Sequence, residues 1–301
     1  MNFMSQILLA LVALASLIIS FTKASASAIR INDVFEQKSD MKEGDTPVLQ
    51  EDGAPKVVFD NVCFAYKGNK DSLTNLSFAA KAGQTIGIIG GTGSGKSTLV
   101  NLIPRFYDVR EGAVKMDGVN VKDYPFGQLR RKVGVVPQNA VLFSGTIRDN
   151  MKWGKKDASD EEIYRALELA QAKEFVDNKP EGLDTKILQG GKNLPGGQRQ
   201  RLTIARALVG QPEVLILDDS ASALDFATDS KLRRALTALP KGMTAFIVSQ
   251  RATTIRGANQ IIVLDDGAVA GIGTHLELFE TCEVYKEICL SQLSEKELGR
   301  S

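Results

Sequence analysis

The chain has 301 residues, of which 37 are basic and 36 acidic, so its formal net charge is only +1. This balance excludes recruitment of nucleic acid or an acidic membrane surface by a global electrostatic field, and any specificity must be local. The length suits one large domain or two modest ones with an ample core. Three cysteines, Cys63, Cys282 and Cys289, lack metal-ligand spacing and indicate reduced packing residues in a cytosolic compartment.

The N-terminal run "ILLALVALASLIISF", from Ile7 to Phe21, carries no charge and leaves two interpretations open. It predicts a membrane-spanning helix if Phe3 to Gln6 are included, because a span needs about 20 apolar residues. It also resembles a secretory signal, since Ala24 to Ala28 offers small residues for cleavage, although no basic residue precedes the run. Lys23 and Arg30 follow it, which favours a membrane helix whose C-terminal side is cytoplasmic.

The composition of the sequence predicts where its segments and its compact domain begin and end. Apolar residues spaced along 29–35 predict a cytoplasmic extension of the first helix, so that 1–37 forms one segment. Residues 38–56 are charged and carry Gly and Pro, which indicates a linker. We expect a compact domain over 57–292 and a short tail at 293–301.

The pattern within the compact domain predicts an α/β fold. Three β-rich segments, at 57–66, 76–90 and 112–121, suggest a small antiparallel sheet, and Asp117-Gly118 marks a tight turn. Uniformly apolar runs suit a parallel sheet covered on both faces, and they lie at 86–89, 214–217, 245–248 and 261–264. Between about 138 and 202 the pattern is mainly helical, with Ser159 placed to cap a helix and Glu162 three residues on. This region is expected to be an inserted helical lobe.

The clearest chemical motif is "GGTGSGKST", which follows an apolar strand at 85–89 and precedes the helical run "LVNLI". A phosphate chain needs backbone N–H groups that converge, and glycine permits both the φ values and the close approach. The strand before the loop and the helix after it favour a phosphate-binding loop over a simple turn. Lys96 would reach the β- and γ-phosphates, and the Ser97 hydroxyl would ligate Mg²⁺. The predicted ATP-binding residues of this loop are Gly90, Gly91, Thr92, Gly93, Ser94, Gly95, Lys96, Ser97 and Thr98.

A second apolar strand, at 214–217, ends in the adjacent carboxylates Asp218 and Asp219. Two like charges at the end of a buried strand are unfavourable unless a cation needs them. Beside a phosphate-binding loop, Asp218 is therefore predicted to hold Mg²⁺.

Three further motifs resemble those of ATP-binding cassette proteins. "NLPGGQRQRLTIARAL" at 193–208 is similar to the signature motif, "VVPQ" ending at Gln138 to the Q-loop, and "SALD" ending at Asp225 to the D-loop. The resemblance covers 57–292, and "VLFSGTIRDNM" after Gln138 looks like the exporter branch. The N-terminal helix resembles the last transmembrane helix of an exporter permease domain. A P-loop ATPase needs cytosolic ATP, which argues against a secretory signal.

The resemblance implies a P-loop NTPase with a RecA-like, mainly parallel sheet, a small antiparallel β subdomain and an inserted helical lobe. It also implies that two such domains meet head to tail and trap ATP between the P-loop of one and the signature of the other. Gln138 would bind Mg²⁺ and act as a catalytic residue, together with Asp219 and Gln250. Tyr66 matches the aromatic that stacks on adenine, although it also suits strand packing in the small sheet. The signature residues are Leu194, Pro195, Gly196, Gly197 and Gln198.

The sequence departs from the family pattern at three site positions. Asp219 stands where most members carry the Glu that acts as general base, and its side chain is shorter by one C–C bond, about 1.5 Å. Gln250 in "FIVSQR" stands where the family has a switch histidine, and an amide cannot carry a positive charge. Pro195 replaces the signature Ser and removes a hydroxyl and a backbone N–H. The only histidine, His275, is expected at the surface near a helix start.

These departures resemble the degenerate-site subunit of heterodimeric bacterial multidrug exporters. The expected function is ATP binding and weak hydrolysis that powers or gates export of a drug, lipid or peptide. The expected partners are a second half-transporter subunit, in a hetero- or homodimer, and permease helices in the plasma (inner) membrane, with the nucleotide-binding domain cytoplasmic. Since exporter half-transporters carry six transmembrane helices and this chain has at most one, it resembles the C-terminal part of such a subunit.

Two alternatives come from other functional classes. A non-hydrolysing ATP-binding clamp or regulatory module fits the same three departures. A soluble DNA-repair ATPase would call for a coiled-coil or zinc insertion in the helical lobe, and the sequence shows neither. We therefore expect no nucleic-acid partner.

Overall fold

The computed structural model describes residues 2–37, 41–44, 53–67, 71–220, 228, 231 and 242–292. By contacts the chain divides into two units, residues 1–42 and 43–301, and each is described by itself. The predicted D-loop residue Asp225 and the predicted tail at 293–301 lie outside the described residues.

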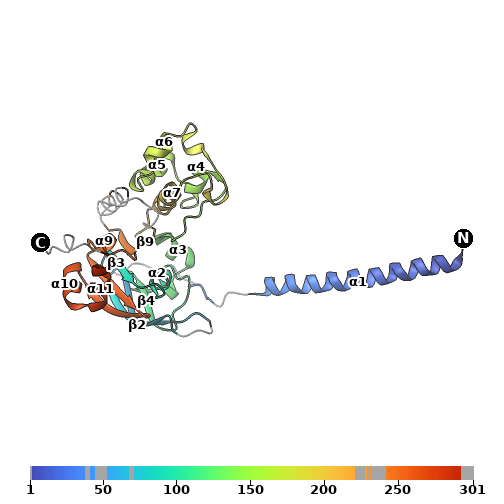
Figure 1. The fold of residues 1–301 in the computed structure, drawn as a ribbon, viewed down its shortest axis with the longest axis horizontal. Coiled ribbons are helices and arrows are strands. Elements are labelled where there is room, and N and C mark those ends of the chain that lie inside the picture. Colours follow the sequence, from blue (N-terminus) through green and yellow to red (C-terminus); the bar gives the residue numbers. More distant parts are fainter. Residues whose placement is uncertain are drawn as a thin grey trace. The chain divides into compact units, whose positions relative to one another are not determined.

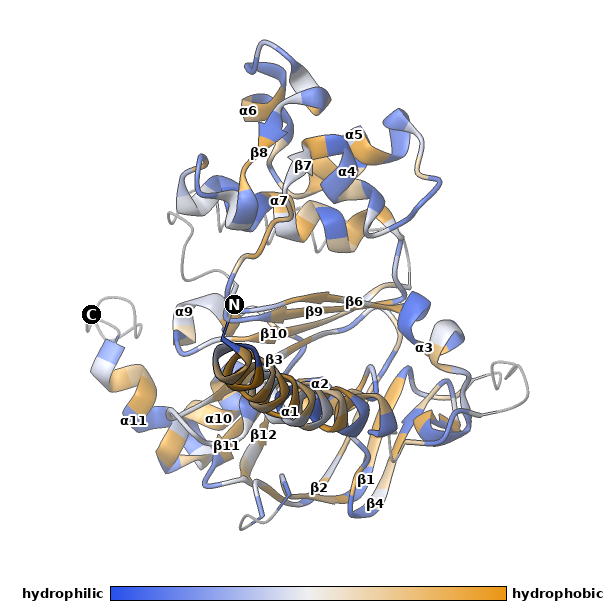
Figure 2. Ribbon diagram, turned by 90° about the vertical axis from the view of Figure 1, so that its right-hand side faces the viewer, coloured by the Kyte–Doolittle hydropathy of each residue, from blue (hydrophilic) through white to orange (hydrophobic). Residues whose placement is uncertain are grey.

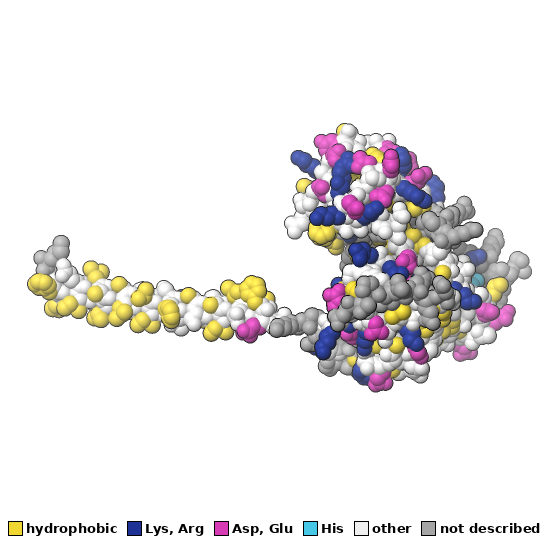
Figure 3. Space-filling model, turned by 180° about the vertical axis from the view of Figure 1, so that it is seen from behind, with side chains coloured by type: hydrophobic (Ala, Val, Ile, Leu, Met, Phe, Trp, Pro, Cys, Tyr) yellow, Lys and Arg dark blue, Asp and Glu magenta, His cyan; other side chains and the backbone are white. Residues whose placement is uncertain are grey.

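The first unit contains one long helix, α1 (Phe3–Glu36), whose described residues are all exposed. Figure 3 shows hydrophobic side chains along the length of its visible face, and the Thr22 hydroxyl donates to the Ile18 carbonyl within the helix at 2.8 Å. At 1.5 Å per residue its 34 residues span about 50 Å, which exceeds the roughly 30 Å hydrocarbon core of a bilayer. By length and apolarity α1 can cross a membrane and extend beyond it, a test that a signal sequence also passes.

An antiparallel sheet forms one layer of the second unit, with strand order β2-β1-β4-β5. The predicted tight turn joins β4 to β5, and both Asp117 (φ 52°) and Gly118 (φ 84°) are left-handed, as a short hairpin requires. The predicted antiparallel sheet is therefore confirmed. Its strands are β1 (Val57–Phe64), β2 (Leu73–Ala80), β4 (Glu111–Met116) and β5 (Val119–Asn120).

A six-stranded sheet forms the centre of the second unit, in the order β12-β11-β3-β10-β9-β6. All neighbouring strands are parallel except the antiparallel edge strand β12. The four predicted apolar strands are confirmed, whereas β6 and β12 were not predicted. The segment predicted as β-rich over 76–90 is shared between two sheets, because its first part is in β2 and its last part is in β3. The strands are β3 (Thr85–Gly90), β6 (Val133–Val136), β9 (Val214–Asp218), β10 (Thr244–Val248), β11 (Gln260–Asp265) and β12 (Ala268–Gly273).

The two faces of this sheet bury different side chains. Along β9, Val214 and Ile216 pack into the cluster that includes the antiparallel sheet, whereas Leu215 and Leu217 pack with the helical lobe and the C-terminal helices. Strand side chains alternate between faces, so a strand covered on both sides is apolar throughout. Figure 2 shows this hydrophobic colouring along β9 and β10. The fully covered sheet forms a rigid base for the loops at its edge.

Helices complete the second unit, and α4 to α7 gather in one lobe beside the sheets (Figure 1). The lobe also holds the two-stranded sheet of β7 and β8, and α7 runs beyond the expected limit near 202. The predicted cap of α5 is confirmed, since Ser159 Oγ accepts from Glu162 N and the Glu162 carboxylate accepts from Ser159 N. The helices are α2 (Lys96–Leu102), α3 (Phe126–Lys132), α4 (Ile147–Lys152), α5 (Asp160–Leu169), α6 (Lys173–Asp177), α7 (Gly196–Val209), α9 (Ala252–Ile255), α10 (His275–Thr281) and α11 (Glu283–Gln292), and the lobe strands are β7 (Gly145–Thr146) and β8 (Lys186–Ile187).

Two described parts of the expected linker, 43–44 and Lys56, contact the domain. A Glu43 carboxylate oxygen accepts from Phe126 N at 2.7 Å, and Gly44 N donates to the Tyr124 carbonyl at 3.3 Å. Lys56 is only 4% exposed and pairs with Asp117 and Glu213. Within 38–56, these described residues thus belong to the domain surface and core.

Candidate nucleotide-binding site

The predicted phosphate-binding loop lies between β3 and α2. Gly90 has no room for a side chain, because a Cβ there would be 2.1 Å from the Leu264 carbonyl oxygen of neighbouring β11. Gly95 precedes α2 with φ +94°, in the left-handed region that favours glycine. The glycines thus let the loop approach β11 and turn directly into a helix.

Lys96 begins α2 and is 8% exposed. Its ammonium group donates to the carbonyl oxygens of Gly90 at 3.0 Å and Gly91 at 2.6 Å. Burial lowers the pKa of Lys96, although the carboxylates of Asp219 and Asp218 act in the opposite direction. A partly desolvated cation at the mouth of the loop gains more from an incoming phosphate than a solvated one would.

Ser97 and Asp218 meet at the end of β9, where the Ser97 hydroxyl donates to Asp218 Oδ1 at 3.0 Å. Burial raises the pKa of Asp218, an effect that the Ser97 hydrogen bond opposes and the Asp219 charge reinforces. Across the described part of the chain, no three His, Cys, Asp or Glu side chains gather as a metal cluster. Mg²⁺ typically uses one or two carboxylates together with substrate phosphates, so the Ser97–Asp218 pair fits it. The ion would supply charge neutralisation at the phosphates.

Asp219 has a different backbone conformation from its neighbour, with φ +45°. Its N–H donates to the Val248 carbonyl at 3.0 Å, which ties the end of β9 to the end of β10. Gln138 Nε2 approaches Asp219 Oδ2 at 3.5 Å, at the limit of a hydrogen bond. Burial raises the pKa of Asp219, against the opposing charges of Lys96 and Arg251.

One pocket of about 480 Å³ collects most of the predicted residues. Gly90, Gly91 and Ser94 of the loop are not part of its lining, and neither are the predicted signature residues. The arrangement therefore offers backbone amides, a cation, a hydroxyl and carboxylates to one phosphate-bearing ligand. The predicted residues in the lining are Tyr66, Thr92, Gly93, Gly95, Lys96, Ser97, Thr98, Gln138, Asp218, Asp219 and Gln250.

Tyr66 lies at the rim of this pocket. Its hydroxyl is 3.2 Å from Thr98 Oγ1 in the loop, and its ring packs edge-on against Tyr107 and Phe64. The residue thus combines strand packing with access to the pocket. Stacking on adenine stays a prediction.

The sequence did not predict four charged, polar or glycine residues of the lining: Asp71, Ser72, Asp266 and Gly267. Gly267 (φ +80°) lies in the β11–β12 turn, and its carbonyl accepts from Thr74 N at 2.8 Å. A Cβ on Gly267 would be 2.7 Å from the Ser72 carbonyl oxygen. The Asp-Gly pair indicates a turn, but only tertiary structure brings that turn to the phosphate loop.

The signature residues form the start of α7. Pro195 precedes the helix with φ −55°, and its carbonyl accepts from Gln198 N at 3.0 Å and Arg199 N at 3.1 Å. Proline is therefore tolerated here without strain, as expected for a helix start. The Gln198 side-chain oxygen is buried and finds no hydrogen-bond partner in the part of the chain that the structure describes.

His275 begins α10, as predicted, but it is half-buried rather than simply at the surface. Its Nδ1 is 2.8 Å from the Tyr285 hydroxyl, and burial lowers its pKa. Cys63, Cys282 and Cys289 are free and buried, which agrees with their predicted packing role.

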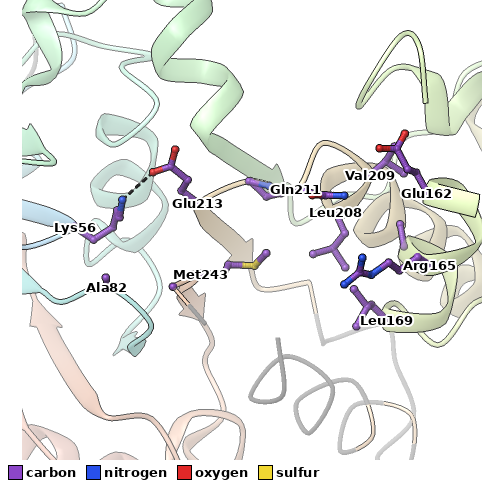
Figure 4. A pocket seen from close by; sticks show the side chains of 13 residues that line it. Lys56, Ala82, Glu162, Arg165, Leu169, Leu208, Val209, Gln211, Glu213 and Met243 are labelled. Carbon is purple, nitrogen blue, oxygen red and sulfur yellow. Dashed lines mark hydrogen bonds and ion pairs between the residues drawn. The ribbon is translucent and has the colours of Figure 1, made fainter. Parts of the chain in front are cut away.

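A second pocket, of about 380 Å³, is lined by residues around the start of β9 rather than its end. Figure 4 shows Arg165, Leu169 and Leu208 from the helical lobe on one side and Lys56, ion-paired with Glu213, on the other. Since the nucleotide-site residues lie at the carboxyl ends of the parallel strands, this pocket takes no part in that site.

The parallel sheet, the glycine loop between β3 and α2, and the Ser97–Asp218 pair define a P-loop NTPase domain. Comparison with known proteins narrows the class. The family described as ABC transporter matches residues 73–222. The ABC transporter ATP-binding protein YfiB of Bacillus subtilis is 44% identical over 292 residues, covering 97% of this chain and 50% of that protein. The chain therefore contains the ATP-binding domain of an ABC transporter, with an N-terminal helix able to span a membrane.

Other relatives are exporters by name. The beta-(1→2)glucan export ATP-binding/permease protein NdvA of Rhodopseudomonas palustris is 43% identical over 245 residues, covering 81% of this chain and 41% of that protein. The solved structure of a bacterial Atm1-family ABC exporter with ATP bound superposes with a TM-score of 0.85 at 33% identity, covering 91% of this chain and 48% of that one. This chain thus spans about half the length of these relatives.

Proposed function

We propose that this chain is an ATP-binding, slowly hydrolysing subunit of a dimeric ABC exporter in the plasma (inner) membrane, with its nucleotide-binding domain in the cytoplasm. The observation that carries the proposal is that Asp219 and Gln250 line the same pocket as Lys96 and Ser97. The loop and Asp218 supply what Mg-ATP binding needs, while the two substituted positions act on the attacking water and the γ-phosphate.

Slow hydrolysis follows from geometry and charge. The Asp219 carboxylate is one C–C bond, about 1.5 Å, shorter in reach than that of Glu, and a misplacement of this order can cost about a hundredfold in rate. Gln250 can donate a hydrogen bond to phosphate but brings no positive charge. Both changes weaken stabilisation of the same transition state.

The partner domain would complete the site. The signature residues Leu194 to Gln198 lie outside the lining of this chain's own pocket, which supports their use by the ATP of a second subunit. Pro195 provides neither hydroxyl nor N–H to that ATP, and we expect weaker stimulation of the partner site. The expected D-loop role of Asp225 belongs to the same head-to-tail arrangement.

The permease would contact the helical lobe. A cavity of about 790 Å³ lies among α3, β6, the end of α4 and the end of α7, and Trp153 and Arg206 line it. Trp153 is 69% exposed and packs on Phe143, and the buried Arg206 Nη1 atom has no hydrogen-bond partner among the described residues. An exposed aromatic pair beside a guanidinium that has one unsatisfied donor favours a polypeptide partner here. The exported substrate, a drug, lipid or peptide, would be selected by membrane helices rather than by this domain.

The proposal is tested by single-turnover hydrolysis of saturating Mg-ATP by the full chain in detergent, alone and with a candidate partner subunit. We expect slow turnover in the wild type and an increase of about a hundredfold when Asp219→Glu is combined with Gln250→His. Asp219→Asn is the matched control, because it keeps the side-chain length but removes the base. Wild-type turnover equal to that of the double variant would contradict the degenerate-site proposal.

A second candidate function is an ATP-binding clamp or regulatory module without useful turnover. Asp219, Gln250 and Pro195 together favour it, because they affect both this chain's own site and the partner's. If turnover returns only when Pro195→Ser is added to the other two changes, this second function is the better one.

A further inference from the structure

The C-terminal helix reaches the segment that carries Gln250. Gln292, the last residue of α11, donates from Nε2 to the Gln250 carbonyl at 2.8 Å. Its Oε1 accepts from Ala252 N at 2.9 Å. One side-chain amide therefore bridges two backbone groups on either side of Arg251.

The bridge supplies a missing helix cap. Arg251 is the N-cap residue of α9 and makes no side-chain cap hydrogen bond. Ala252 is fully buried, and its N–H is among the first-turn donors that have no partner inside the helix. Gln292 satisfies this donor from a distance of 40 residues in sequence.

The helix that carries Gln292, α11, is held in place by buried side chains. Tyr285, Cys289 and Gln292 are spaced i, i+4 and i+7, so they lie on one face of α11. Tyr285 and Cys289 are fully buried, and the Tyr285 hydroxyl bonds to His275. The packed face that holds α11 in place thus also aims the Gln292 amide.

The residues that precede Gln250, Val248 and Ser249, are held by hydrogen bonds to neighbouring segments. Ser249 N donates to the Ile88 carbonyl at 3.0 Å, and the Val248 carbonyl accepts from Asp219 N. Gln250 is the first residue beyond these ties, and it is exposed on the wall of the nucleotide pocket. Two contacts hold its backbone: the Arg251 N–H donates to Ser249 Oγ at 2.9 Å, and the Gln250 carbonyl accepts from Gln292 Nε2.

We propose that Gln292 is a positioning residue that orients Gln250 toward the γ-phosphate of ATP. The inference rests on the proposed function, since it assumes that Gln250 meets the γ-phosphate. It makes α11 a structural support of the nucleotide site, although Gln292 itself touches no nucleotide.

The test compares affinities of the full chain for Mg-ATP and Mg-ADP, because only ATP carries the γ-phosphate. We expect Gln292→Ala to weaken ATP binding by up to about tenfold, the scale of one hydrogen bond to a charged group, and to leave ADP affinity unchanged. Gln250→Ala should also lower the ratio of ATP affinity to ADP affinity. The double variant Gln250→Ala with Gln292→Ala should show no further loss of this ratio. Gln292→Glu keeps the acceptor for Ala252 N but loses the donor for Gln250, so its ratio should fall between those of wild type and Gln292→Ala.

Ser291→Ala is the matched control, because the Ser291 hydroxyl donates to the Ile288 carbonyl within α11 and contacts neither Gln250 nor Ala252 in the described structure. Equal losses of ATP and ADP affinity in Gln292→Ala, or no loss beside a clear loss in Gln250→Ala, would overturn the positioning role alone. No change of the ratio in Gln250→Ala would instead overturn the proposed γ-phosphate contact and the inference together.

Discussion

At the residue scale, the adjacent carboxylates Asp218 and Asp219 differ in backbone conformation and in their contacts. Asp218 continues the extended strand and pairs with Val248 across the sheet, whereas Asp219 turns into the left-handed region. Asp218 accepts from Ser97, while Asp219 faces Gln138. The backbone turn therefore separates the carboxylate that we propose for Mg²⁺ from the one that we propose for the attacking water.

Asp218→Asn should remove the Mg²⁺ dependence of ATP binding. Asn has nearly the same shape as Asp but no charge, and Mg²⁺ prefers carboxylate oxygen. We expect the affinity of the variant for ATP in the presence of Mg²⁺ to fall by about tenfold or more, which is the scale of one charged contact. In EDTA, its affinity for ATP should stay within a few-fold of the wild-type value.

Asp71→Asn is its control, because Asp71 lines the same pocket but pairs with Arg110. Equal Mg²⁺ dependence in both variants would refute the assignment of Asp218 to the metal.

At the element scale, an ion-pair network joins four parts of the domain. Lys56 at the start of β1 and Lys132 at the end of α3 both contact Asp117, in the β4–β5 turn, and Glu213 before β9. Asp117 is 1% exposed, so its charge is tolerated only because both lysines reach it. The network secures the base of the parallel sheet, opposite the nucleotide site.

Glu213→Gln tests how this network contributes to the pH dependence of the unfolding free energy. Burial alone would raise the pKa of Glu213, but hydrogen bonds and charges from Lys56 and Lys132 outweigh it and hold that pKa below its usual 4.5. A lowered pKa stabilises the fold above the unfolded value, and this stabilisation is lost as pH falls through the folded value. We expect Glu213→Gln to lower the unfolding free energy by about 1 kcal/mol at pH 7, a discounted figure because the side chain is 41% exposed.

Urea denaturation at neutral and acidic pH measures the effect. The difference between variant and wild type should shrink as the pH falls below the usual Glu value. A difference that stays constant would show that the carboxylate charge contributes nothing to stability.

At the scale of the whole molecule, the buried clusters lie entirely within the second unit, while α1 has no buried residue. A chain of residues 43–301 should therefore fold alone and melt within about 4 °C of the full chain in the same detergent, a shift equivalent to about 1 kcal/mol for a domain of this size. The full chain should float with lipid vesicles, whereas residues 43–301 should remain in the aqueous fraction. If residues 43–301 also bound the vesicles, α1 would not be the membrane anchor of the full chain.

Local sequence determined the parts whose geometry is local. The loop from Gly90 to Thr98, the Asp117-Gly118 turn and the Ser159 cap each depend on residues a few positions apart, and their conformations follow from φ restrictions and nearby hydrogen bonds. The uniformly apolar strands were also predictable from local sequence, because a strand that is buried on both faces is apolar at every position. The strand β6, only four residues long, carried too weak a pattern.

Tertiary structure alone decided which distant residues meet. The order β11-β3-β10-β9 brings Ser97 to Asp218, and the β11–β12 turn to the phosphate loop. The burial of Lys56 among Asp117 and Glu213, and the contact of Gln292 with Gln250, join residues that no local pattern relates. Strand order and helix packing are set by the burial of the whole core, so the sequence determined the chemistry at each position and the fold determined its partners.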